Sequence, residues 1–144
     1  MKRWICFLLL VILASGCATG YQKRNWLGGY YETKIQDDVF RIRFFGNAYC
    51  HLDKAEDYAL LRCSEVVIEN GFKYFIIVEN KSESQAEVYS APAVNSTSPK
   101  IKTSYKSSAT VTIKCFKEKP GGASVIIYDA GQVKYNLKKQ YHLN

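Results

Sequence analysis

The stretch DKAEDYALLRCSEVVIENGFKYFIIVE, residues 53–79, decides the fold of this 144-residue chain. Apolar residues recur in its first part at helical spacing, which predicts one amphipathic helix over 53–70. We expect Asp53 to cap this helix, with Glu56 three residues on completing a capping box. The residues expected on its buried side are Leu52, Ala59, Leu60, Cys63, Val66 and Val67.

A nearly all-apolar segment follows the helix at once. Asn70-Gly71 supplies the left-handed residue that commonly stops a helix. The next residues, FKYFIIVE at 72–79, then predict a strand in a central position of a sheet. Because the connection is so short, the helix must fold straight back onto this strand. We expect the helix–strand unit to form the core of the domain.

A hairpin is predicted upstream of this unit. The β-branched and aromatic runs at 30–35 and 39–45 are separated by the turn-rich trio Gln36-Asp37-Asp38. In the second strand Phe40, Ile42 and Phe44 alternate with polar residues and are expected to face the core. Arg41 and Arg43 then share the outer face, as part of a solvated strand surface or, alternatively, as an anion-binding pair.

Four further elements are predicted downstream, after a turn at 80–82. They are a less regular strand at 83–89, a strongly alternating strand at 109–117, a short strand at 125–128 and a helix at 129–140 capped by Asp129. Between the first two lies the Ser/Thr/Pro-rich segment SAPAVNSTSPKIKTSYKSS, residues 90–108, expected to be a long loop or an extended hairpin tip.

The predicted element order is β-β-α-β-β-β-β-α. Hairpins imply antiparallel neighbours, and two amphipathic helices imply that one face of the sheet is covered. We therefore expect an α+β fold, with a single antiparallel sheet of about five to six strands and two helices packed on one face. Residues 30–144 have the size of one such domain.

The first residues, MKRWICFLLLVILASGC at 1–17, predict an export signal. Two positive charges precede a ten-residue apolar run that is too short for a permanent membrane helix, and small residues precede a cysteine. The end of this stretch resembles the lipobox of bacterial lipoproteins, which implies cleavage after residue 16 and lipid on Cys17. Residue 18 is Ala and not Asp, which favours the periplasmic face of the outer membrane. Ordinary secretion with an incidental cysteine is the alternative.

Residues 17–29 are predicted to be a lipidated tether, in which Trp26-Leu27 docks on the domain and Gly28-Gly29 gives a flexible entry. The chain carries 20 basic and 13 acidic residues, for a formal net charge of +7. Without the signal this balance is only mildly basic, and no long basic run is present. Nucleic acid is therefore an unlikely kind of partner, whereas the membrane and an anionic envelope component are compatible with the charge.

Three cysteines remain in the mature part, Cys50, Cys63 and Cys115. Two of them fall on apolar faces, so the ordinary interpretation is burial, with one disulfide among the three as an alternative. Their spacing matches no metal-binding or redox motif, and no cofactor or metal site is predicted. The sequence contains no phosphate loop, nucleophile elbow or zinc-binding helix motif, which favours a non-enzyme over a small periplasmic hydrolase.

Five blocks occur in order behind the lipobox: GGYYETKI, FRIRFFGNAYC, EDYALLRCSE, NGFKYFIIVEN and ATVTIKCFKEKP. Together they resemble a family of small uncharacterised proteobacterial lipoproteins known by Caulobacter locus tags. The resemblance implies the fold and the envelope location, and it brings no reaction or catalytic residue. The resulting hypothesis is an outer-membrane-anchored, non-catalytic binding or structural module whose partner is an envelope protein or an anionic component. The alternative is a thiol-based redox or metal-binding protein that uses Cys50, Cys63 and Cys115.

Overall fold

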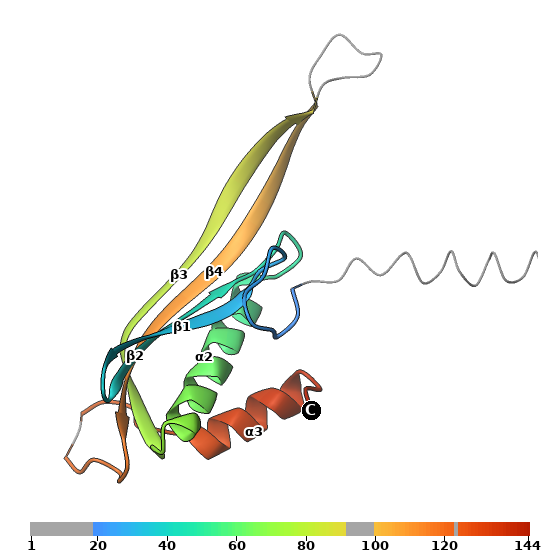
Figure 1. The fold of residues 1–144 in the computed structure, drawn as a ribbon. Coiled ribbons are helices and arrows are strands. Elements are labelled where there is room, and N and C mark those ends of the chain that lie inside the picture. Colours follow the sequence, from blue (N-terminus) through green and yellow to red (C-terminus); the bar gives the residue numbers. More distant parts are fainter. Residues whose placement is uncertain (1–18, 92–99, 123) are drawn as a thin grey trace, which may run out of the picture.

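Five strands form one antiparallel sheet in the order β1-β2-β4-β3-β5, with two helices on one side of it (Figure 1). This computed structural model describes residues 19–91, 100–122 and 124–144. The strands are β1 (Gly29–Gln36), β2 (Val39–Phe45), β3 (Tyr74–Ala91), β4 (Lys100–Phe116) and β5 (Tyr128–Asp129), and the helices are α2 (Leu52–Glu69) and α3 (Ala130–Gln140). The α+β fold predicted from the sequence is confirmed, with five strands in the described ranges.

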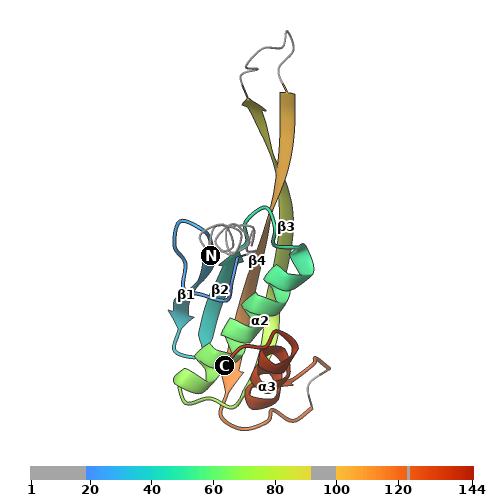
Figure 2. The same cartoon turned by 90° about the vertical axis from the view of Figure 1, so that its right-hand side faces the viewer.

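The core lies between α2 and one face of the sheet. On β2, Phe40, Ile42 and Phe44 are buried, and their neighbours on the other face are half-buried, as the alternation predicts. α2 packs on β4, β2 and β3, whereas α3 packs chiefly on α2 and reaches the sheet near β5 (Figure 2). The helix and the remaining strands contribute a further set of fully buried residues: Ala55, Ala59, Cys63, Val66, Val67, Phe75, Ala109, Val111, Ile113 and Cys115.

The helix ends agree with the sequence in part. The prediction that Asp53 caps α2 is wrong, because the helix begins at Leu52 and the N-cap is His51, whose side chain makes no capping bond. Asp53 instead lies in the first turn, where its negative charge still interacts favourably with the helix dipole. At the other end Gly71 has a φ of 77° and stops the helix as predicted. The Asp129 cap of α3 is confirmed, since its carboxylate accepts from the Gln132 amide at 3.1 Å.

β3 and β4 are longer than the sequence predicts. The expected turn at 80–82 is wrong: β3 runs through it, with a register shift between Ile77 and Glu79, because cross-strand pairing with β4 continues on both sides. The expected loop at 90–108 is strand over 90–91 and 100–108, which agrees with the extended-hairpin interpretation, and residues 92–99 lie outside the described residues. The strand expected at 125–128 is reduced to Tyr128–Asp129.

The N-terminal segment, residues 19–28, falls within the predicted tether and makes several contacts with the domain. Thr19 is 3% exposed; its amide donates to Asn47 Oδ1 at 3.2 Å, and its hydroxyl accepts from the Asn47 amide at 2.7 Å. The hydroxyl also donates to the Leu27 carbonyl at 3.1 Å. Gly28, expected to give flexibility, has a φ of 110°, and a Cβ there would lie 2.3 Å from the Phe45 carbonyl oxygen. The segment is therefore packed on the body of the domain.

Candidate functional site

A buried arginine fixes the N-terminal segment, β1 and both helices to one another. Arg62 of α2 is 9% exposed, and its guanidinium donates to the carboxylates of Glu32 on β1 and of Glu65 and Glu69 on α2. The Tyr21 hydroxyl donates to Glu65, and Lys138 of α3 lies 4.0 Å from the same carboxylate. We call Arg62, its three carboxylates and Tyr21 the Arg62 network.

The titration of this network suits a structural role. Burial works against the Arg62 charge, but hydrogen bonds to Glu32 and Glu69 hold its pKa above the usual value. Burial, followed by the hydrogen bond to Glu65, raises the pKa of Tyr21 well above its usual value. Arg62 therefore stays charged and Tyr21 stays neutral at ordinary pH, so neither group is poised to move a proton.

Cys17 lies outside the described residues, only two positions before Thr19. Two residues of chain span at most about 7 Å. A lipid attached to Cys17 would therefore lie close to the point where the described chain begins. The sequence predicts a roughly ten-residue spacer, and the packing of residues 19–28 removes most of it.

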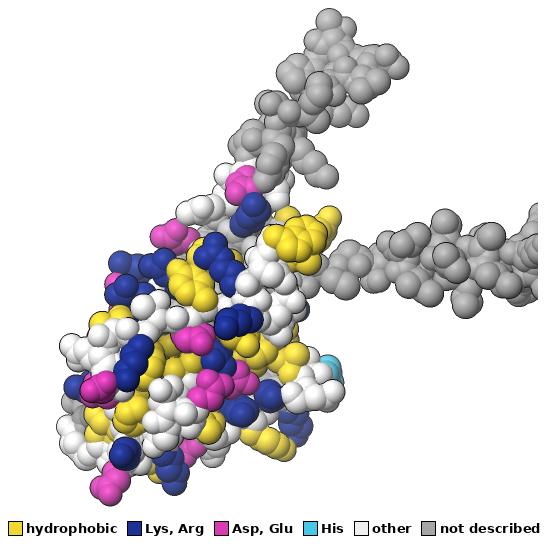
Figure 3. Space-filling model, viewed as in Figure 1, with side chains coloured by type: hydrophobic (Ala, Val, Ile, Leu, Met, Phe, Trp, Pro, Cys, Tyr) yellow, Lys and Arg dark blue, Asp and Glu magenta, His cyan; other side chains and the backbone are white. Residues whose placement is uncertain are grey.

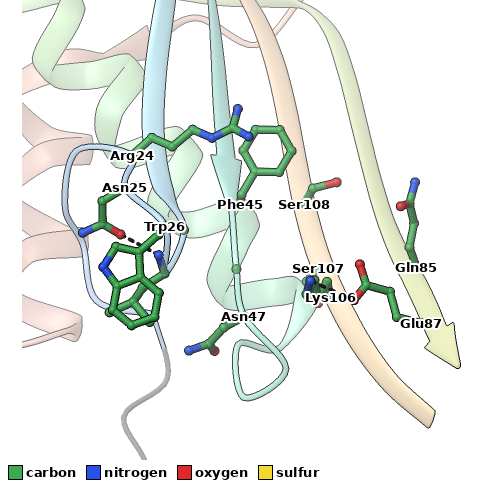
Figure 4. Close-up of a pocket in the computed structure, with 13 residues that line it drawn as sticks. Arg24, Asn25, Trp26, Phe45, Asn47, Gln85, Glu87, Lys106, Ser107 and Ser108 are labelled. Carbon is green, nitrogen blue, oxygen red and sulfur yellow. Dashed lines mark hydrogen bonds and ion pairs between the residues drawn. The ribbon is translucent and has the colours of Figure 1, made fainter. Parts of the chain in front are cut away.

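A groove of about 420 Å³ opens between the N-terminal segment and the strands β3 and β4 (Figure 4). On one side Arg24 holds its guanidinium carbon 4.2 Å from the centre of the Phe45 ring, which also stacks on Tyr31. On the other side the Lys106 ammonium pairs with Glu87 at 2.8 Å. The lining is mixed in polarity, and three elements that are distant in the sequence contribute to it.

Trp26 does not dock on the domain, contrary to the sequence-based expectation. Its side chain is 90% exposed, at the tip of a tight turn closed by the bridge between Asn25 and Gly28. Figure 4 shows its indole beside the start of the described chain and away from the strands β3 and β4. In Figure 3 hydrophobic and basic side chains gather around this same point.

Arg41 and Arg43 lie together on the outer face of the sheet, opposite α2, as predicted. They line a second groove of about 450 Å³ that continues from the first. Arg43 Nη1 donates to the Tyr31 hydroxyl at 3.2 Å, and its Nε is buried without a partner among the described residues. Glu79 and Glu83 of β3 line the same groove, so this surface is of mixed charge.

The three cysteines lie in the core and do not meet the requirements of reactive thiols. Cys50, Cys63 and Cys115 are free and at most 3% exposed, so the structure contains no disulfide among them. Burial raises the pKa of all three thiols, that of Cys115 to about 12. Redox and metal-binding cysteines need the opposite, an accessible thiolate.

The chemistry available in the described ranges is limited. No group of three or more His, Cys, Asp or Glu side chains in residues 19–91, 100–122 and 124–144 is placed to hold a metal ion. Within the same ranges no helix combines the length and hydropathy that crossing a bilayer requires. The carboxylates of Asp53, Glu56 and Asp57 stay at one end of α2, and Asp57 accepts from the Tyr141 hydroxyl at 2.7 Å.

Comparison with protein-family models, with curated proteins and with solved structures gives no match to this chain.

Proposed function

We propose that this chain is a lipid-anchored, non-catalytic protein of the bacterial envelope, held through Cys17 at the periplasmic face of the outer membrane, that binds an envelope partner. The observation that carries the binding role is the two-stranded end of the sheet. Beyond the Ser84–Ser107 pair, β3 and β4 continue for seven residue pairs, from Gln85–Lys106 to Ala91–Lys100. We call residues 85–91 and 100–106 the arm; it rises from the body in both views (Figures 1 and 2).

The arm is long for a two-stranded ribbon. Seven residues at about 3.3 Å each give roughly 23 Å of ribbon. Among the arm residues whose burial the structure describes, 85–87 and 103–106, none is a fully buried apolar residue. A two-stranded ribbon on its own is marginally stable in water. Its length is more simply understood as a surface for a partner than as a contribution to folding.

The backbone of the arm supports one mode of binding in particular. Among the described residues neither strand of the arm pairs with a third strand, so each presents a row of backbone N–H and C=O groups. An extended segment of another protein can add to such an edge by main-chain hydrogen bonds. We propose a protein segment of this kind as the partner, and the groove beside Arg41 and Arg43 as the place where an anionic group of it would contact the body.

A photocrosslinking experiment in intact cells tests the arm. Tyr105 lies on the arm and Tyr135 on α3, and their side chains are 58% and 65% exposed. A photoreactive phenylalanine analogue at Tyr105 should give discrete adducts after irradiation, and the same analogue at Tyr135 should not. The variant Ala86→Pro should interrupt β3 opposite Tyr105 and thereby remove the Tyr105 adducts. Adducts of equal yield from both positions would contradict a binding role of the arm.

The anchor is tested separately. The variant Cys17→Ser should lose incorporation of labelled palmitate and leave the membrane fraction, with its circular dichroism unchanged. A variant Cys50→Ser is the matched control, because Cys50 lies 33 positions further on in the folded domain. Retention of Cys17→Ser in the membrane after a high-salt wash would refute the anchor.

A further inference from the structure

An exposed aromatic surface surrounds the point where the described chain begins. Trp26 is 90% exposed, Leu27 46% and Tyr49 66%. We call these three residues the aromatic rim. They belong to two turns separated by more than twenty residues, and the hydrogen bonds of Thr19 to Leu27 and to Asn47 hold these turns together.

We infer that the aromatic rim docks into the interfacial region of the bilayer that carries the lipid of Cys17. This inference rests on the proposed anchor. Thr19 lies between the two turns, and two residues of chain cannot place Cys17 more than about 7 Å from it. The rim is therefore next to the bilayer whenever Cys17 is lipidated.

The chemistry of the rim matches that location. Tryptophan and tyrosine combine an apolar ring with a polar atom and concentrate at membrane–water interfaces. Lys23 and Arg24 precede the rim and are exposed, which favours contact with anionic headgroups. The apolar surface of an indole that is 90% exposed is in contact with water, which is unfavourable. Burial at the interface removes this surface from water.

Single-tryptophan fluorescence tests this inference directly. The chain has two tryptophans, Trp4 and Trp26, and cleavage of the signal removes Trp4. Mature lipidated protein is reconstituted in vesicles of phosphatidylethanolamine and phosphatidylglycerol, with and without brominated acyl chains. We expect bromination to reduce the emission of Trp26 at least about twofold, and vesicle binding to shift it to shorter wavelength.

The matched control moves the fluorophore. In the double variant Trp26→Phe with Tyr135→Trp, the only tryptophan lies on α3, at a position that is 65% exposed in the wild type. Its emission should be insensitive to bromination. Unquenched emission from Trp26, or equal quenching at both positions, would overturn the inference. A blue shift that grows with protein density, without quenching by bromine, would also overturn the inference. It would show that the rim binds a second copy of the chain.

Flotation of the same vesicles separates the two proposals. If mature wild-type protein does not float with vesicles, the anchor itself fails. A second outcome is that the wild-type protein floats, Cys17→Ser does not, and bromination leaves the emission of Trp26 unchanged. This outcome refutes only the docking of the rim.

Discussion

Arg62 shows what one buried charge can organise. Its guanidinium is nearly inaccessible, yet it holds three carboxylates from two elements and covers the Tyr30 ring at 4.9 Å. The position of Arg62 on α2 fits no simple amphipathic pattern. Its partner Glu32 lies 30 positions away on β1. No local signal in the sequence connects the two, so this part of the structure was beyond prediction.

Replacing Arg62 tests how much the network stabilises the fold. Arg62→Met should lower the free energy of unfolding by about 3 kcal/mol, because the three carboxylates would remain close together without their central cation. Urea denaturation of the mature chain measures the change. Lys34→Met is the matched control: Lys34 pairs with an exposed Asp37 at 2.9 Å, and its loss should leave stability unchanged within error. Equal effects from both variants would contradict a special role of Arg62.

Gly46 occupies a position where the Cys50 side chain leaves no space for a Cβ. A Cβ there would lie 2.6 Å from the Cβ and 2.9 Å from the sulfur of Cys50. Gly46→Ala should therefore destabilise the domain by about 1–3 kcal/mol through overpacking. Gly20→Ala, at a site with nothing within 4 Å, should be neutral or slightly stabilising. Thermal unfolding of both variants measures this, and a Gly46→Ala melting curve like that of the wild type would contradict the expected clash.

Periodic sequence patterns predicted the helices and strands that pack on the core. They did not predict the arm or the N-terminal segment. The alternation of Phe40, Ile42 and Phe44 and the helical spacing in α2 follow from burial, so sequence reasoning found them. The arm side chains that the structure describes, at 85–87 and 103–106, are exposed or half-buried and impose no alternation. The Ser, Thr and Lys residues of the arm resemble a loop. The N-terminal segment is likewise held by single contacts of Thr19 and Tyr21, which leave no period in the sequence.

Removal of the arm should leave the body intact. Replacing residues 85–106 by Asn-Gly joins Ser84 to Ser107 through a two-residue hairpin turn. The free energy of unfolding should change by no more than about 1 kcal/mol, because the described side chains of the arm, at 85–87 and 103–106, lie outside the core. Ser107 must be kept, since its carbonyl accepts from the Gly46 amide at 2.8 Å. Loss of a cooperative transition would show that the arm supports the sheet.

For the whole molecule, the sequence predicted the layers, and the structure corrected the expected tether, because residues 19–28 pack on the domain. One sheet with α2 across its face was expected, and the location of Cys17 remains a proposal. Arg41 and Arg43 share a face and the thiols are buried, as predicted, whereas the groove and the rim emerge only once distant residues meet. These features depend on contacts such as Thr19 to Asn47, which span 28 positions.

Global stability should fall in alkaline solution. Burial raises the pKa of Cys50, Cys63 and Cys115, so the folded chain keeps thiol protons that the unfolded chain releases above about pH 9. Their contribution is complete below that pH and is lost as pH rises towards the folded-state values. Each thiol should lower the free energy of unfolding by about 1.4 kcal/mol per pH unit there.

Denaturation of the mature Cys17→Ser chain between about pH 8 and about pH 10 measures this slope. Cys63→Ala should reduce the slope by one thiol's share, since it removes one of the three groups. A free energy of unfolding that does not change with pH over this interval, or a slope that Cys63→Ala leaves unaltered, would contradict the linkage.

The strand order has a consequence for how the chain reaches its native state. β4 lies between β2 and β3, so β2 receives its second neighbour from residues about 70 positions later, as the contact of Arg41 with Thr112 illustrates. Such non-local pairing is slow to form. During synthesis the β1–β2 hairpin therefore has an open edge and an uncovered apolar face until residues 108–114 arrive. Chains truncated before that point should aggregate, because the edge of β2 and the apolar face of the hairpin stay open until the central strand is present.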